Sequence, residues 1–237
     1  MKKSYLFMIP ACALVFLGLL VCGFLGSKVI GVISENQPLK NRTCFIIDAG
    51  HGGVDGGAVS CTGAYESHIN LQIALKLNDL MHLLGYETKM IRSTDISVYT
   101  SGESIAAKKS SDLKERVRIV NSTPNGILLS IHQNHFSDSY YSGAQMFYPK
   151  TDGSRILANQ LQQTFIAALN PDSNRQAKPA ESLYLMKHIQ KTGVLIECGF
   201  LSNYEEEAKL RDPEYQKKIC CVIVSACNEY LHSQQIT

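Results

Sequence analysis

Three apolar runs in the sequence each end in a side chain suited to metal or proton chemistry. The runs are FIIDAGH, ILLSIH and GVLIE, and they end in His51, His132 and Glu197. Since the parallel strands of an open α/β sheet bind ligands beyond their shared carboxyl edge, we expect these side chains to face one crevice. Two imidazoles and one carboxylate can hold a catalytic zinc ion and leave a coordination position for water.

The carboxylate of such a metal site should come from a loop or a helix start near His51. Glu66 meets this condition, because it lies in the first turn of a predicted helix. Asp48 and Asp55 are competing candidates, since both lie within a few residues of His51. The position of the residues along the chain leaves the choice among the three open.

The segment that carries His51, GHGGVDGG, is rich in glycine. It matches neither the dinucleotide-binding fingerprint nor a phosphate-binding loop, which would end in Gly-Lys-Ser/Thr. Glycine adopts positive φ angles at little cost. We therefore expect the loop to fold tightly behind His51, and we hypothesise that it lets a bulky substrate approach the site.

Short β-branched runs alternate with segments of helical periodicity from residue 43 onward. The expected strands are residues 43–47, 88–91, 127–131, 144–148, 183–186 and 193–196. The expected helices are residues 66–84, 112–121, 156–169, 202–210 and 213–232, with Asp112 capping the second of them and Ser202 the fourth. The pattern predicts a single α/β domain with a mostly parallel central sheet flanked by helices on both faces.

The amino-terminal end of the chain has the pattern of a membrane segment. Lys2 and Lys3 precede residues 5–25, which contain no charged side chain and are long enough to span a bilayer. We interpret residues 1–26 as an N-terminal transmembrane signal anchor, with a cleaved signal peptide as the alternative. Residues 27–42 would be a linker, and residues 43–237 a catalytic domain on the outer side of the membrane.

Composition excludes several other classes of protein. The formal net charge is only +2, tryptophan is absent, and no basic stripe interleaves with aromatic residues, so a nucleic-acid partner is not expected. Eight cysteines are present without any CxxC spacing, and two of them lie inside the apolar amino-terminal run. We interpret the other six mostly as buried small apolar residues.

Four motifs in order resemble those of a known enzyme family. They are DAGHGGVDGGA, Glu66 followed by Asn70, SIHQN and IECGFLSN. In order and spacing they are similar to the zinc-dependent N-acetylmuramoyl-L-alanine amidases usually called amidase type 3. The resemblance covers residues 43–231. The compact length and the segments DLKERVRIVN, SGAQMFY and GFLSNYEEEAKL look closest to the sporulation-specific members, which act on spore cortex peptidoglycan.

The resemblance implies a mechanism and a substrate. His51, Glu66 and His132 would be the zinc ligands, and Glu197 the catalytic carboxylate that takes a proton from the activated water. The substrate would be peptidoglycan, cleaved between the lactyl group of muramic acid and L-alanine. In the spore cortex this step would allow a deacetylase to make muramic lactam, at the cortex side of a forespore membrane.

Other residues could support this chemistry. Asp48 and Asn134 are candidates for orienting His51 or the substrate, and Arg175 for meeting a peptide carboxylate. The short segment between His132 and residue 144 has no room for the inserted plug that blocks the metal in some relatives. Any control would therefore come from a partner, such as an activator or accessory protein, or from the timing of expression.

Two other functions remain as alternatives at this point. One is a zinc carboxypeptidase or other metallopeptidase of the cell wall, and the other is a catalytically silent wall-binding module. The silent module is disfavoured because none of the four predicted site residues is lost.

Overall fold

The computed structural model of the chain describes residues 43–235. The strands are β1 (Cys44–Ala49), β2 (Glu87–Met90), β3 (Gly126–Asn134), β4 (Gln145–Tyr148), β5 (Lys178–Pro179) and β6 (Thr192–Phe200). The helices are α2 (Glu66–Leu83), α3 (Ile105–Ser122), α4 (Ser154–Leu169), α5 (Tyr184–His188), α6 (Tyr204–Arg211) and α7 (Pro213–Gln235). The predicted membrane segment and linker, residues 1–42, lie outside the described residues. Within the described part of the chain, no helix combines the length and apolar character needed to cross a membrane.

The strands form one sheet in the order β2-β1-β3-β6-β4-β5. All neighbouring strands are parallel except β4 and β6, which are antiparallel. The prediction of a mostly parallel sheet is therefore confirmed. Because β1, β3 and β6 are parallel and adjacent, their carboxyl ends lie at the same edge of the sheet.

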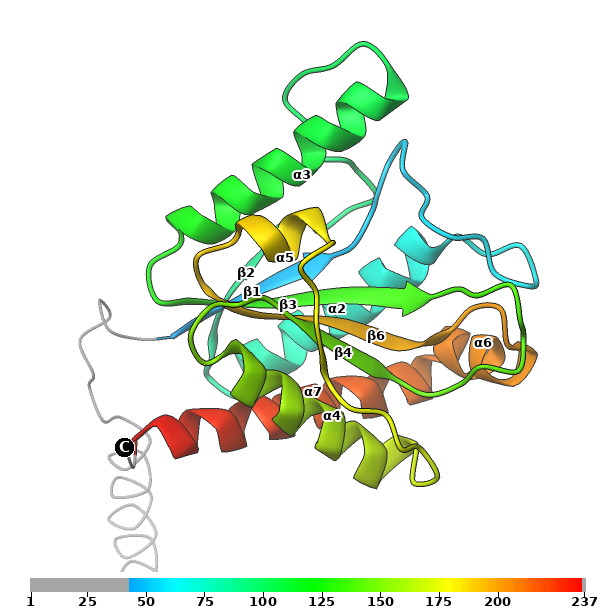
Figure 1. Ribbon diagram of the computed structural model, residues 1–237, viewed down its shortest axis with the longest axis vertical. Helices are drawn as coiled ribbons and strands as arrows, with labels where there is room; N and C mark the ends of the chain where they lie inside the picture. Colours follow the sequence, from blue (N-terminus) through cyan, green and yellow to red (C-terminus); the bar gives the residue numbers. More distant parts are fainter. Residues whose placement is uncertain (1–42, 236–237) are drawn as a thin grey trace, which may run out of the picture. The chain divides into compact units, whose positions relative to one another are not determined.

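Helices cover both faces of this sheet, as predicted (Figure 1). Helices α2, α4 and α7 pack on one face, against alternate strand residues such as Phe45 and Ile47. Helices α3 and α5 pack on the other face, where Ile46 lies in one apolar cluster with Val120 and Leu185. The alternation of side chains along β1 therefore places apolar residues in both layers, as in a sheet that is buried on both sides.

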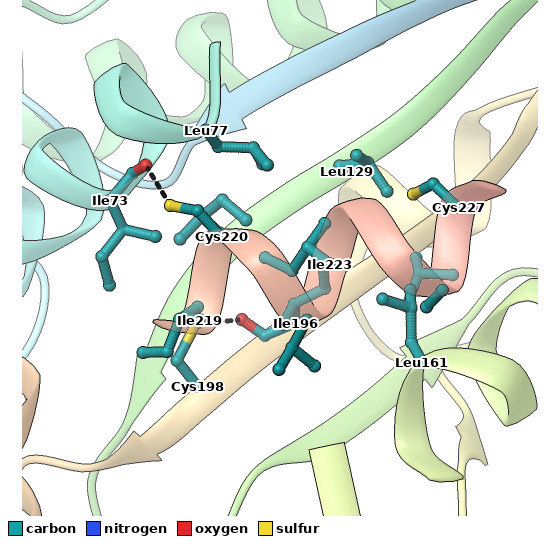
Figure 2. Packing of buried hydrophobic residues seen from close by; sticks show 14 of the residues in the cluster. Ile73, Leu77, Leu129, Leu161, Ile196, Cys198, Ile219, Cys220, Ile223 and Cys227 are labelled. Atoms are coloured by element: carbon teal, nitrogen blue, oxygen red, sulfur yellow. Dashed lines mark hydrogen bonds between the residues drawn. The ribbon is translucent and has the colours of Figure 1, made fainter. Parts of the chain in front are cut away.

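Cysteines form part of the larger core cluster, which Figure 2 shows. Cys220 donates from Sγ to the Ile73 carbonyl oxygen at 3.5 Å, and Cys198 donates to the Ile196 carbonyl oxygen at 3.8 Å. Burial raises the pKa of the Cys220 thiol to about 12 and that of Cys198 well above its usual range. All six described cysteines are free, and Cys44, Cys198, Cys220 and Cys227 are buried, so the interpretation as mostly buried apolar residues is confirmed.

The prediction of a strand at residues 183–186 is wrong, because helix α5 occupies this position. Leu185 and Met186 are adjacent and both buried in the cluster with α3. Adjacent side chains of a strand would point to opposite faces, whereas a helix turn can bury both against the sheet. A short apolar run does not distinguish these two structures.

Two helix starts also differ from the prediction. Helix α3 begins earlier than residue 112 and is capped by the Ser104 hydroxyl, so Asp112 lies inside the helix, where it pairs with Arg116. Helix α6 is capped by Asn203, whose side chain accepts two backbone N–H groups of the first turn. The predicted cap, Ser202, lies one residue too early.

Candidate active site

His51, Glu66 and His132 come together at the carboxyl edge of β1 and β3. Their potential ligand atoms all lie within 4.8 Å of one another. Glu66 lies between the two imidazoles, with Oε2 at 3.2 Å from His51 Nε2 and Oε1 at 2.9 Å from His132 Nδ1. Two imidazole nitrogens and one carboxylate are thus available to a single metal ion, and this donor set fits a divalent cation with an open coordination position.

The glycine loop after β1 gives the backbone the shape that this site requires. His51 itself has a φ of 61°, in the left-handed region. A Cβ atom added at Gly57 would lie 2.6 Å from Glu66 Oε2, and one added at Gly50 would lie 2.2 Å from His132 Nε2. The loop therefore packs directly against the site, which confirms that it folds tightly behind His51.

Two buried arginines, which the sequence analysis missed, hold this backbone in place. Arg116 donates from Nη2 to the His51 carbonyl oxygen at 2.7 Å and from Nη1 to that of Ala49 at 3.1 Å. Arg92 donates from Nε to the Ala49 carbonyl oxygen at 2.7 Å and from Nη2 to that of Gly50 at 3.0 Å. Both arginines are 2% exposed. Their guanidinium groups satisfy carbonyl groups that the tight turn would otherwise leave unpaired.

Asp48 lies outside the metal-binding set and forms a buried ion pair with Arg116. Its second oxygen accepts a hydrogen bond from Ser130 Oγ at 2.7 Å. Burial alone would raise the pKa of Asp48, but the Arg116 guanidinium outweighs burial and lowers it. Arg116 also contacts Asp112, one helical turn earlier, at 2.5 Å. That spacing is the one signal in the sequence that could have identified Arg116.

Asp55, the other competing carboxylate, contacts the far side of the His51 ring. Its Oδ2 lies 2.9 Å from His51 Nδ1, and its Oδ1 lies 2.7 Å from Lys109 Nζ. Because Nδ1 is engaged by Asp55, Nε2 is the nitrogen that faces Glu66. A carboxylate on the outer nitrogen is the usual partner of a metal-bound histidine, since it fixes the tautomer and the ring orientation.

Glu66 is itself held in place by three hydrogen bonds. It accepts from the backbone N–H of Ala58 at 3.0 Å, from Asn70 Nδ2 at 3.1 Å and from the backbone N–H of Gln133 at 3.2 Å. The residue is 4% exposed. Its position at the first turn of α2, close to the end of β3, makes it the one carboxylate among the three candidates that reaches both imidazoles.

Two of the three potential metal ligands have strongly shifted pKa values. Burial would raise the pKa of Glu66, but contacts with His132 and His51 lower it far below its usual range. Burial would lower the pKa of His51, but Glu66 and Asp55 raise it to about 9. The anionic carboxylate is therefore strongly favoured, as a metal ligand must be.

Glu197 lies beside this set on the neighbouring strand. In the parallel pairing of β3 and β6, Glu197 is the register partner of His132. Its Oε2 atom is buried and has no hydrogen-bond partner among the described residues. Burial raises the pKa of Glu197 to about 7, with His132 opposing the shift and Glu66 reinforcing it. A carboxyl group that titrates near neutral pH can both accept and return a proton.

Neither Asn134 nor Arg175 makes a hydrogen bond to the three potential metal ligands within the described residues. Asn134 ends β3, and its carbonyl oxygen accepts the backbone N–H of Leu201 at 2.7 Å. Arg175 donates from Nε to the Ser142 carbonyl oxygen at 3.0 Å and lies 5.0 Å from the centre of the Phe200 ring. It lines a groove formed by other loops of the same domain.

Comparison with known proteins shows that the chain matches a family of enzymes over most of its length. The family described as N-acetylmuramoyl-L-alanine amidase, amidase type 3, matches residues 45–229. A curated relative, the germination-specific N-acetylmuramoyl-L-alanine amidase of Bacillus subtilis (strain 168), is 33% identical over 195 residues. The match covers 81% of this chain and 81% of the relative.

Two solved structures have a similar fold. The CwlD amidase from Clostridioides difficile, solved in complex with the GerS lipoprotein, is 38% identical with a TM-score of 0.77 and covers 81% of this chain and 100% of that chain. An N-acetylmuramoyl-L-alanine amidase from Clostridium difficile 630 is 31% identical with a TM-score of 0.70, and covers 81% and 98%. Because the family matches residues 45–229 and the fold is shared with these structures, the chain belongs to the amidase type 3 family of N-acetylmuramoyl-L-alanine amidases.

Proposed function

We propose that this amidase is zinc-dependent and that His51, Glu66 and His132 hold the ion. The observation that carries the proposal is the meeting of these three residues, with ligand atoms within 4.8 Å of one another, beside the register partner of His132, Glu197. Two histidines and one glutamate form a frequent ligand set of catalytic zinc in hydrolases. When bound, zinc polarises the amide carbonyl and makes water more acidic.

The chain's own residues then provide the proton transfers. Glu197 accepts a proton from the attacking water at its unpaired Oε2 atom and returns it to the nitrogen of the departing amine. A pKa of about 7 suits both steps at neutral pH. Asp55 binds His51 Nδ1 and so keeps the tautomer in which Nε2 is available to the metal ion. Asp48 acts on His51 indirectly, because it pairs with Arg116, which donates a hydrogen bond to the His51 carbonyl oxygen.

The substrate is the peptide-bearing muramic acid of peptidoglycan, and the bond is the one between the lactyl group and L-alanine. Family membership favours this reaction over the carboxypeptidase and wall-binding alternatives. Similarity to the germination-specific amidase supports a role in spore cortex maturation, including the muramic lactam step. We assign Asn134 to substrate contact at the site edge, because it lies just beyond His132.

An accessory protein and an extracytoplasmic location complete the proposal. The CwlD relative was solved with the GerS lipoprotein, which supports an accessory partner for this chain as well. Peptidoglycan lies outside the cytoplasmic membrane, so the catalytic domain would act there, attached through residues 1–26 or released after their cleavage.

The experiment is a comparison of the purified chain with its Glu197→Gln variant on cortex-type peptidoglycan. Zinc content is determined for both, and released peptides are identified by mass spectrometry. We expect the parent to release peptides that begin with L-alanine, and the variant to retain zinc without releasing them. A parent that contains no zinc, alone or with an accessory protein, would contradict the zinc assignment. Release of single C-terminal amino acids would indicate a carboxypeptidase.

A further inference from the structure

A polar groove of about 960 Å³ lies beside strand β4, which neighbours β6 in the sheet. Its walls are the loop at residues 140–143, the loop at residues 169–178 and the start of α6. Gln145, which lines the groove, is the register partner of Glu197 in the antiparallel pairing of β4 and β6. The groove is therefore one strand away from the residue that we assign to proton transfer, a separation of about 5 Å between neighbouring backbones.

The walls of the groove are fixed by buried contacts within the fold. Glu206, which is 9% exposed, accepts the backbone N–H of Gly143 at 2.9 Å and that of Phe200 at 2.8 Å. Asn203 donates from Nδ2 to the Ser139 carbonyl oxygen at 2.9 Å. These bonds tie the 140–143 loop to the end of β6 and to α6. The groove is thus formed before any ligand binds, which reduces the cost of binding.

Arg175 is held in this groove with part of its guanidinium group available. Its Nε atom donates to the Ser142 carbonyl oxygen, and the planar group lies over the Phe200 ring. These two contacts fix the plane, whereas the two terminal nitrogens have no hydrogen-bond partner among residues 43–235. A guanidinium group with both terminal nitrogens free binds a carboxylate through parallel hydrogen bonds.

The charges of the lining indicate the kind of ligand. Basic side chains are Arg175, Lys178 and Lys209, and acidic ones are Asp172, Glu205 and Glu206. The Glu206 carboxylate is already engaged by two backbone N–H groups, so it does not neutralise Arg175 by direct contact. A lining that carries both signs suits a short peptide with carboxylate and amino groups better than a neutral glycan or a polyanion.

We propose that this groove binds the peptide stem of the substrate and that Arg175 grips one of its carboxylates. The inference rests on the proposed function, since it assigns the peptide side of the amidase reaction to this face. A peptide that starts at the scissile amide beside Glu197 reaches the groove on the β4 side of the site. An extended chain advances about 3.3 Å per residue, so the residues after the first L-alanine lie along the groove.

The test compares two soluble muropeptides that differ only in whether the peptide carboxylates are free or amidated. The full chain is compared with Arg175→Gln, and with Arg155→Gln as a matched control, because Arg155 is an exposed arginine on α4 outside the groove. For the substrate with free carboxylates, we expect Arg175→Gln to raise KM about tenfold or more, because a charge-assisted hydrogen bond is lost. The value of kcat should remain nearly unchanged. For the amidated substrate we expect KM to change less than twofold. Arg175→Lys should restore part of the affinity, because lysine keeps the positive charge but cannot form the two parallel hydrogen bonds of a guanidinium group.

A binding measurement separates this proposal from the proposed function. Calorimetric titration of the Glu197→Gln variant with the free peptide needs no turnover, so it can be done even if the parent proves inactive. We expect this variant to bind the peptide and the Glu197→Gln, Arg175→Gln double variant not to bind it. That result would support peptide binding in the groove. In Arg175→Gln, a KM raised equally for both substrates would overturn the proposal. Tighter binding of a peptide-free glycan than of the peptide by the Glu197→Gln variant would also overturn it. If Arg175→Gln does not fold, Asn174→Trp, which fills the groove from an exposed position, should raise KM for both substrates at least tenfold. An unchanged KM in that variant would also overturn the proposal.

Discussion

His132 on β3 and Glu197 on β6 are register partners in neighbouring parallel strands. This pairing places one potential zinc ligand next to a carboxyl group whose Oε2 atom is buried and unpaired among the described residues. The two residues therefore have different roles at the strand ends. His132 offers an imidazole nitrogen to a metal ion, and Glu197 offers a carboxylate oxygen to a proton. The arrangement depends on the parallel register of the sheet, which is fixed by the buried core on both faces.

Glu197→Gln should separate chemistry from metal binding. The amide keeps the size of the side chain but cannot accept the proton, so we expect kcat to fall by about 10² to 10⁴-fold. Zinc content and thermal stability should remain close to those of the parent, since Glu197 is not in the ligand set. Steady-state kinetics and metal analysis check this, with Glu181→Gln, an exposed glutamate paired with Lys150, as the control. Loss of zinc together with activity would place Glu197 among the ligands instead.

Arg116→Met should destabilise the domain and loosen His51. Removal of the guanidinium leaves Asp48 buried, at 1% exposure, without its cation, and breaking a buried pair in this way costs about 3–5 kcal/mol. The His51 carbonyl oxygen also loses its donor. We therefore expect a lower denaturant midpoint and weaker zinc binding. The control Arg118→Met removes an exposed arginine of the same helix and should change neither quantity measurably.

A double variant distinguishes the charge effect from the positioning of His51. Asp48→Asn combined with Arg116→Met removes both charges of the buried pair, so part of the lost stability should return, although Asp112 and the His51 carbonyl oxygen still lack their donor. Zinc affinity should stay low, because the donor to His51 is still missing. Recovery of zinc affinity along with stability would mean that Arg116 acts on the fold alone.

Zinc binding to the metal-free chain should release a proton from His51. The raised pKa, about 9, means that this imidazole is protonated at neutral pH while Glu66 and Asp55 face it. The metal can bind Nε2 only after that proton leaves, so the apparent affinity should rise up to tenfold per pH unit below pH 9 and level off above it. Calorimetry in two buffers of different ionisation enthalpy measures the number of protons released. An affinity that does not depend on pH between 7 and 9 would contradict the protonation of His51.

The same shift has a consequence for the stability of the metal-free chain. A raised pKa in the folded state means that the stabilising interaction is fully present below the unfolded value, near 6.5. It is then lost as the pH rises through about 9. We expect the melting temperature of the metal-free chain to fall between pH 6.5 and 9. A His51→Gln variant should lack this part of the pH dependence.

The placement of the site could be predicted from the sequence because it follows from strand order and direction. His51, His132 and Glu197 each end an apolar run, and parallel strands bring such ends together. The choice of Glu66 over Asp48 and Asp55 could not be made by position along the chain. It depends on where α2 starts relative to β3, which is a tertiary relationship.

The arginines show a second limit of sequence reasoning. Arg92 and Arg116 act on the backbone at residues 49–51, far from them along the chain. The spacing of Asp112 and Arg116 marks an ion pair within a helix, but no local pattern marks the contact with the loop. Helix α5 was mistaken for a strand because a short apolar run fits both structures. In both cases packing across the sheet decided the outcome, and local propensity did not.

Gly50→Ala should remove zinc binding through a single steric contact. The new Cβ atom would lie 2.2 Å from His132 Nε2, so the ring must leave the position in which its Nδ1 atom faces Glu66. Gly50 does not have a positive φ, and the effect would therefore come from the contact rather than from backbone strain. Gly85→Ala is the matched control, because its Cβ would meet nothing within 4 Å but its φ is 82°. We expect that control to lose about 1–3 kcal/mol of stability and to keep its zinc. Metal analysis and thermal unfolding of both variants test this, and a Gly50→Ala protein that retains zinc at parental affinity would show that His132 is not held against the loop.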